Sequence, residues 1–84
     1  MVDIEQRITT YVADQMMAPQ GRETGELSGH TELFRSGILD SFGLLGLVHY
    51  LEREFGIRVQ DEEMHPENFR DVASIARFVR DKQG

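Results

Sequence analysis

The sequence predicts a small all-α protein, a four-helix bundle of three main helices and one short helix with a long loop between helices 1 and 2. Apolar residues recur at spacings of three and four in three separate segments, which is the helical period. Each of these segments begins at a residue that favours a helix start, and no segment shows a convincing strand pattern. A chain of 84 residues supports one core, so we expect a single domain over residues 1–84.

The first predicted helix begins after Asp3, a good N-cap residue, with Gln6 three positions later as in a capping box. Pro19 and Gly21 predict its end. The apolar side chains between these limits recur at helical spacing, and they are Ile4, Ile8, Tyr11, Val12 and Met16. These side chains should form the buried face of this helix.

The segment from about residue 18 to residue 40 loses the helical period, and its glycines and Ser28 predict an irregular loop. A loop of this length is uncommon in a compact domain and is often functional. Several apolar residues are nevertheless spread through it, and we expect them to anchor the loop to the core: Leu27, Leu33, Phe34, Ile38 and Leu39.

The second predicted helix runs from Ser41 to Phe55, with Gly56 as its C-terminal stop. At about 100° per residue, one wedge of this helix is apolar and should face the core. It contains Leu44, Leu47, Val48, Leu51 and Phe55.

A second wedge of the same helix contains Phe42, Leu45 and His49, with Gly46 and Arg53 beside it. Because one apolar stripe is enough for a bundle, the second stripe is a candidate partner surface. In the alternative interpretation, the long loop folds over it. In that case Phe42 would be the residue that is covered, whereas we expect Leu45 and His49 to be reachable.

The remaining chain predicts an extended segment, a short helical turn and a last helix. Ile57 and Val59 alternate with polar residues, and a helical turn is expected between residues 61 and 68, broken near Pro66. Asp71 can cap the last helix. The apolar side of that helix carries Val72, Ile75, Ala76, Phe78 and Val79.

Composition and charge exclude several classes of function. The net charge of −6 argues against nucleic acid and anionic membranes as partners, and no apolar run is long enough to span a membrane. The chain has no cysteine, and the spacing of His30, His49 and His65 makes no metal-binding pair, so we expect no metal. The N-terminus lacks the features of a signal peptide, and we expect a cytoplasmic monomer.

Ser41 has three possible roles at this point: a helix cap, a nucleophile, or a residue that another enzyme modifies. Asp40 and Ser41 both suit an N-cap, and if one of them caps the helix the other is free. An esterase-type nucleophile needs G-x-S-x-G on a strand-to-helix turn and a base within reach. Here position 39 is leucine and His49 lies two turns away, so we expect no catalytic residue and no enzyme activity.

The run LFRSGILDSFGLLGLVHYLEREFGIRV, followed by PENFRDVASIARFV, resembles the acyl carrier protein family. The matching features begin with Leu33-Phe34, Gly37 and the Asp40-Ser41 pair at a helix start. They continue with Glu54-Phe55-Gly56-Ile57 at the end of that helix, the acids Asp61-Glu62-Glu63, Asn68-Phe69, and Val72 and Ile75 in the last helix. The similarity extends over essentially the whole chain.

The resemblance implies that a phosphopantetheinyl transferase attaches 4′-phosphopantetheine to Ser41, with Asp40 in its recognition motif. The thiol of this arm would then carry an acyl or aminoacyl group as a thioester. The implied partners are an acyl- or amino-acid-activating ligase and a downstream acyltransferase or synthase. Phe42, Leu45, Gly46 and His49 would form the docking surface beside the arm.

One departure from the family pattern bears on the pathway. Fatty-acid carriers have several exposed acids after the serine, whereas this chain has Gly43, Gly46 and His49 there and acids only at Glu52 and Glu54. The D-S-F-G start is similar to aminoacyl and peptidyl carriers. We therefore expect a stand-alone carrier of a specialised aminoacyl, peptidyl or polyketide-type pathway. The alternatives are a fatty-acid carrier and an unmodified helical interaction module in which Ser41 only caps its helix.

Overall fold

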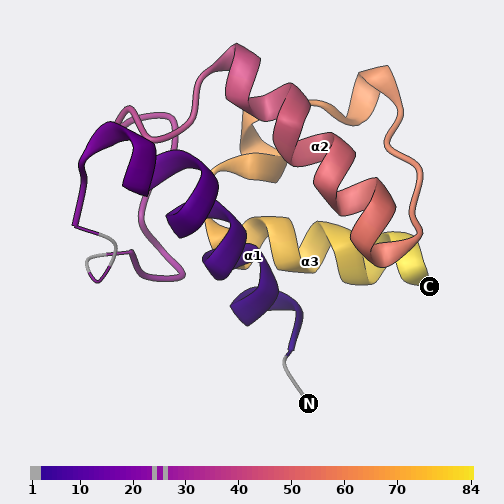
Figure 1. Ribbon diagram of the computed structural model, residues 1–84. Coiled ribbons are helices and arrows are strands. Elements are labelled where there is room, and N and C mark those ends of the chain that lie inside the picture. Colours follow the sequence, from indigo (N-terminus) through magenta and orange to yellow (C-terminus); the bar gives the residue numbers. More distant parts are fainter. Residues whose placement is uncertain (1–2, 24, 26) are drawn as a thin grey trace.

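The computed structural model describes residues 3–23, 25 and 27–84, and within them it contains three α-helices and no strand (Figure 1). The helices are α1 (Ile4–Val12), α2 (Ser41–Phe55) and α3 (Val72–Gln83). A π-helical turn η1 (Ala13–Met17) and a 3-10 turn η2 (Ala18–Gln20) continue α1. Two further 3-10 turns, η4 (Asp61–Glu63) and η5 (Pro66–Phe69), lie between α2 and α3. The predicted all-α fold is confirmed, with two short turns in the place of the fourth helix.

The limits of the first helical segment agree with the sequence, but its geometry does not stay uniform. The Asp3 carboxylate accepts a hydrogen bond from the Gln6 N–H at 2.8 Å, and Gly21 ends the segment at φ 74°. Between these caps the backbone changes from α to π geometry at Ala13. Met16 and Met17, which are adjacent in sequence, are both buried in this turn. The spacing of the apolar residues did not predict this change to π geometry.

The second and third helices begin and end close to their predicted positions. Gly56 ends α2 with φ 65°, a left-handed conformation that favours glycine. Asp71 caps α3 through a 2.8 Å hydrogen bond from the Ser74 N–H. The predicted break near Pro66 is confirmed, because η4 ends at Glu63 and Pro66 begins the separate turn η5. A proline is favoured at such a first position, where its missing N–H is not needed.

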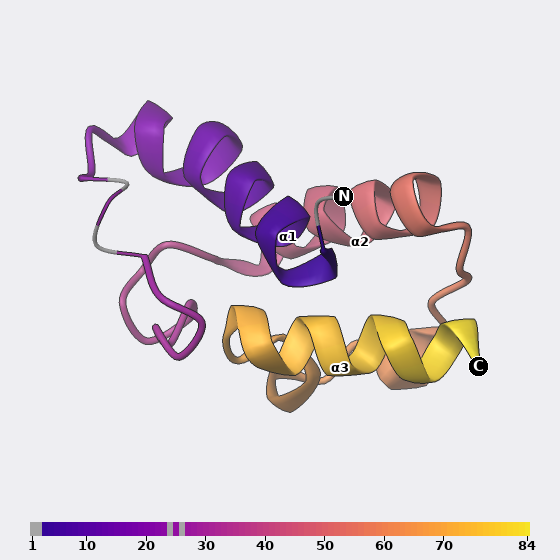
Figure 2. The same cartoon turned by 90° about the horizontal axis from the view of Figure 1, so that it is seen from below.

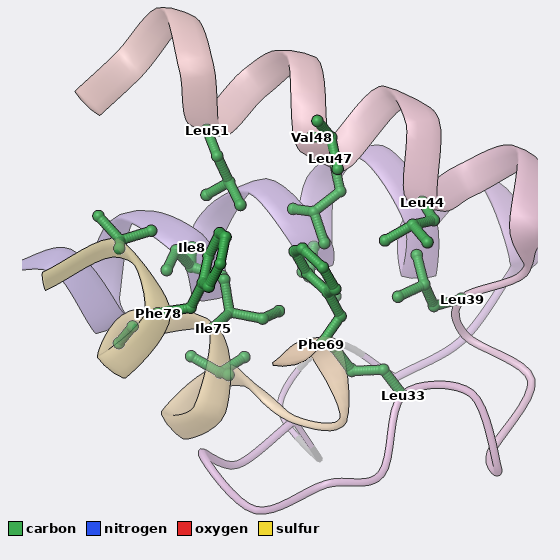
Figure 3. Close-up of a cluster of buried hydrophobic side chains, with 14 of the residues drawn as sticks. Ile8, Leu33, Leu39, Leu44, Leu47, Val48, Leu51, Phe69, Ile75 and Phe78 are labelled. Carbon is green, nitrogen blue, oxygen red and sulfur yellow. The ribbon is translucent and has the colours of Figure 1, made fainter. Parts of the chain in front are cut away.

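The three helices enclose one apolar core with Phe69 near its centre (Figure 3). Phe69 is fully buried, and its ring centroid lies 5.5 Å from that of Phe78. The predicted core faces of α2 and α3 are both buried as expected. The buried side chains of α2 point from one side of the helix only, which leaves the opposite side without a core partner.

The long loop is anchored to the core, as the sequence predicted. It occupies one end of the molecule, where it leads from the end of the first helical segment to the start of α2 (Figure 2). Its side chains Leu33, Ile38 and Leu39 are buried. Backbone hydrogen bonds join Leu33 N–H to the Arg70 carbonyl at 2.8 Å and Ala73 N–H to the Gly29 carbonyl at 2.9 Å. These contacts fix the loop, and with it the first turn of α2.

The acidic residues of η4 are less uniformly solvated than the sequence indicated. Asp61 and Glu62 are exposed, whereas Glu63 is partly buried and lies 2.8 Å from the Lys82 ammonium of α3. The Glu63 carboxylate also accepts the Gln60 N–H at 2.9 Å. The hydrogen bond from Lys82 and that from Gln60 hold the pKa of Glu63 below its usual value. Glu63 therefore joins η4 to α3.

An Asp71→Asn variant should show a weaker dependence of stability on pH than the wild type. Burial disfavours the charged form of Asp71, which is only 3% exposed, but hydrogen bonds from Ser74 and the nearby Arg70 outweigh this and lower its pKa. A carboxylate whose pKa is lowered in the folded state stabilises the fold at pH values above its usual pKa of 3.8. This contribution is lost as the pH falls through the lowered pKa of the folded state.

Asparagine can still accept the Ser74 N–H, so the helix cap remains while the titrating group is removed. The measurement is the urea unfolding free energy of both proteins between neutral and strongly acidic pH. Parallel pH profiles for the two proteins would contradict this role of Asp71.

Candidate functional site

The start of α2 is capped by Asp40. The Asp40 Oδ1 accepts the Gly43 N–H at 2.6 Å, and the Asp40 carbonyl accepts the Leu44 N–H at 2.8 Å. The backbone of Asp40 is extended, with φ −128° and ψ −177°, as is typical of an N-cap. Of the two capping residues that the sequence allowed, Asp40 takes this role.

Gly43 leaves space for the close approach of the Asp40 side chain. A Cβ atom at position 43 would lie 3.2 Å from Asp40 Oδ1 and 3.3 Å from Leu39 Cδ1. Both separations are tighter than ordinary contacts of a side chain. In the sequence, Gly43 was notable only because fatty-acid carriers have acids in this region. In the structure, it leaves space for the Asp40 side chain that caps α2.

Ser41 is the first residue of α2, and it is exposed. Within the described part of the chain its hydroxyl has no hydrogen-bond partner, because the cap is made by its neighbour Asp40. The helix start therefore presents an accessible hydroxyl beside backbone N–H groups of the first turn, which have no partner inside a helix.

The side chains that follow Ser41 on the outer face of α2 are also exposed. Leu45 is 50% exposed and His49 is exposed, as predicted. The alternative interpretation, in which the long loop covers Phe42, is wrong, because Phe42 is 85% exposed. Ile38 and Leu39 turn into the core before the helix begins, so this part of the loop does not lie over Phe42.

Gly46 lies on the edge of this face that borders α1. It is exposed, but a Cβ atom there would lie 3.4 Å from the Tyr11 hydroxyl. The Tyr11 ring stacks on Tyr50 of α2 with centroids 4.2 Å apart. Gly46 thus lies next to the contact between α1 and α2. The sequence did not predict that Gly46 and Tyr11 lie close together.

The residues that the structure describes contain neither a metal-binding cluster nor a membrane-spanning helix. No group of three or more His, Cys, Asp or Glu side chains among them is arranged to hold a metal ion. No helix in the same residues has the length and apolar character needed to cross a membrane. His49 follows Ser41 by eight residues, about 12 Å along the helix axis, too far for it to act as a base for that hydroxyl.

An Asp40→Ala variant should lose about 0.5–2 kcal/mol of unfolding free energy, because the Gly43 N–H then loses its hydrogen-bond partner. An Asp40→Asn variant keeps an acceptor oxygen and should remain close to the wild type. Thermal and urea unfolding followed by circular dichroism would measure both variants. Equal stability of Asp40→Ala and the wild type would mean that the cap is not needed.

Fold and site together define a small helical protein that presents a serine hydroxyl at a helix start, next to an exposed apolar face. Residues 6–79 match the family described as phosphopantetheine attachment site. The chain therefore belongs to this family, which includes the acyl carrier proteins. Its members are carrier proteins, and 4′-phosphopantetheine is their covalently attached cofactor.

Individual relatives agree with this assignment. The chain is 31% identical over 77 residues to a probable acyl carrier protein, PigG, of Serratia sp. (strain ATCC 39006), a match that covers 92% of this chain and 85% of PigG. It is 27% identical over 79 residues to an acyl carrier protein of Rickettsia bellii (strain RML369-C), covering 94% and 85% of the two chains.

A solved structure shares the fold. One chain in the crystal structure of an FAD-dependent dehydrogenase superposes with a TM-score of 0.74 at 24% identity. The match covers 86% of this chain and 97% of the other. At this level of identity the likeness extends to the fold alone.

Proposed function

We propose that Ser41 is the residue that carries the 4′-phosphopantetheine arm, and that the protein passes an acyl or aminoacyl thioester from one enzyme to another. The observation that supports this most is the exposed Ser41 hydroxyl with Asp40 as the cap. A modifying enzyme can reach this hydroxyl without breaking any hydrogen bond of the helix start. No activating base is needed in this chain, because the transferase supplies the catalysis.

The residues around Ser41 suit an attached phosphate. The free N–H groups and the dipole of a helix N-terminus favour a negative group at this position. Asp40 keeps the first turn of α2 in place through the Gly43 N–H, and we propose that the transferase also recognises Asp40. When bound, the arm supplies the thiol that forms the thioester. The protein itself holds the arm at a fixed helix start and offers the adjoining face of α2 to partner enzymes.

The partners that we propose are a phosphopantetheinyl transferase, an acyl- or amino-acid-activating ligase, and a downstream acyltransferase or synthase. Their docking surface would comprise Phe42, Leu45, Gly46 and His49. We further propose a specialised aminoacyl, peptidyl or polyketide-type pathway and a cytoplasmic, monomeric carrier. The support for the pathway is the outer face of α2, which has an apolar pair and a histidine where fatty-acid carriers have acids.

The test begins with the purified protein, coenzyme A and a promiscuous phosphopantetheinyl transferase, followed by intact mass spectrometry. We expect complete gain of one phosphopantetheine group. No gain, under conditions that fully modify a control carrier, would contradict the proposal.

The armed protein is then incubated with ATP and a panel of amino-acid-activating and fatty-acid-activating ligases. We expect at least one amino-acid-activating ligase to load the arm faster than the fatty-acid ligases do. Faster loading by the fatty-acid ligases would contradict an aminoacyl or peptidyl pathway.

A further inference from the structure

The exposed side of α2 changes its chemical character along its length. Phe42, Leu45, His49 and Arg53 form a stripe, named here the outer stripe, within about 80° of the helix circumference. By the same helical period, the outer stripe lies opposite the buried face of α2. Its end near Ser41 is apolar and its far end carries His49 and Arg53. The two ends are about 16 Å apart along the axis.

Both acids of α2 have a partner within the protein. The Glu52 carboxylate accepts the Val59 N–H at 2.9 Å, and the Glu54 carboxylate lies 3.3 Å from the Arg7 guanidinium of α1. The helical period places these acids on the two flanks of α2 and not on the outer stripe. The charge of Glu54 is thus offset by Arg7, whereas Glu52 borders the stripe near its far end and keeps its charge there.

The basic residues at the far end are free by comparison. His49, Arg53 and Arg58 line one open hollow on the surface, where Glu52 is the only carboxylate among the lining residues. All three side chains belong to exposed residues, and neither arginine has an ion-pair partner within the described ranges. This positive region, named here the basic end, occurs in a protein whose net charge is −6.

We propose that the enzyme that loads the arm docks on the outer stripe with an apolar recess for Phe42 and Leu45, and with carboxylates facing the basic end. This inference rests on the proposed function and adds the sign of the charge that the partner must present. Opposite charges at a fixed distance from an apolar contact set the orientation of the bound protein and raise the association rate. A partner with a basic surface would meet Arg53 and Arg58 and would be repelled.

The test measures kcat/KM for loading of the armed protein by the ligase that the panel identifies. An Arg53→Glu/Arg58→Glu variant should load about tenfold more slowly. The two substitutions reverse the charge of the basic end, which removes both the electrostatic steering of the ligase and the charge complementarity in the complex. An Arg77→Glu/Arg80→Glu variant is the matched control. It changes the net charge equally but on exposed positions of α3, and it should load like the wild type.

An Arg53→Gln/Arg58→Gln variant should show a smaller loss in the same direction, and circular dichroism checks that each variant is folded. Added salt should slow the wild type and not the Arg53→Glu/Arg58→Glu variant. Loading of that variant at the wild-type rate, or faster, would overturn the inferred charge. Absence of the arm from the wild-type protein would instead contradict the proposed function, so the two failures are distinguishable.

Discussion

A Ser41→Ala variant is expected to gain no phosphopantetheine at all when incubated with coenzyme A and the transferase. The proposed linkage is a phosphodiester to the Ser41 oxygen, and alanine has no atom that can form it. Any later loading by a ligase should be lost as well, because the thiol is absent. Intact mass spectrometry of the wild type and the variant in parallel measures this directly.

The variant should remain folded, because the Ser41 hydroxyl takes no part in the cap that Asp40 makes. A Ser36→Ala variant is the matched control: it removes an exposed serine of the loop, whose hydroxyl donates to the Leu33 carbonyl, and it should be modified like the wild type. If Ser41→Ala still gained the group, the attachment residue would have to be a different one.

A Phe69→Ala variant should lose about 3–5 kcal/mol of unfolding free energy. Phe69 is fully buried between the helices and contacts Phe78, so truncation leaves a cavity in the centre of the core (Figure 3). Small domains have a total stability of roughly 5–15 kcal/mol, and this loss is therefore a large part of it. Urea unfolding followed by circular dichroism is the measurement.

The same substitution at Phe42 provides the control. Phe42 is 85% exposed, so Phe42→Ala should change stability by less than about 0.5 kcal/mol. It should still slow loading of the arm, because Phe42 belongs to the proposed docking surface. Equal destabilisation by the two variants would mean that Phe42 packs in the core after all.

The helix limits and the core faces were predictable because local rules determine them. Asp3 and Asp71 are good caps, Gly21 and Gly56 are good stops, and the apolar residues between them keep the helical period. The candidate site was predictable in part. The position of Ser41 at the start of α2 followed from the sequence, but the choice between Asp40 and Ser41 as the cap needed the side-chain geometry.

The features that the sequence did not predict depend on contacts between distant segments. The exposure of Phe42 depends on the path of the loop, which Leu33 and Gly29 set through their bonds to Arg70 and Ala73. The ion pair of Glu63 joins residues 19 positions apart. Neither periodicity nor turn chemistry carries information on such pairs, and the π-helical turn at Ala13–Met17 has no compositional signal of its own.

The capping of α2 by Asp40 has a thermodynamic consequence for a carrier that is modified and reused. The proposed attachment at Ser41 would remove no hydrogen bond of the folded state, so modification and folding would be nearly independent equilibria. The phosphate adds only the roughly 0.3–1 kcal/mol that a negative group contributes at a helix N-terminus. The free energies of unfolding of the unmodified and modified proteins should thus differ by no more than about 1 kcal/mol. Partner enzymes would then have to distinguish the unmodified from the modified protein by the arm and its cargo, because the stability of the helical bundle is nearly the same in both.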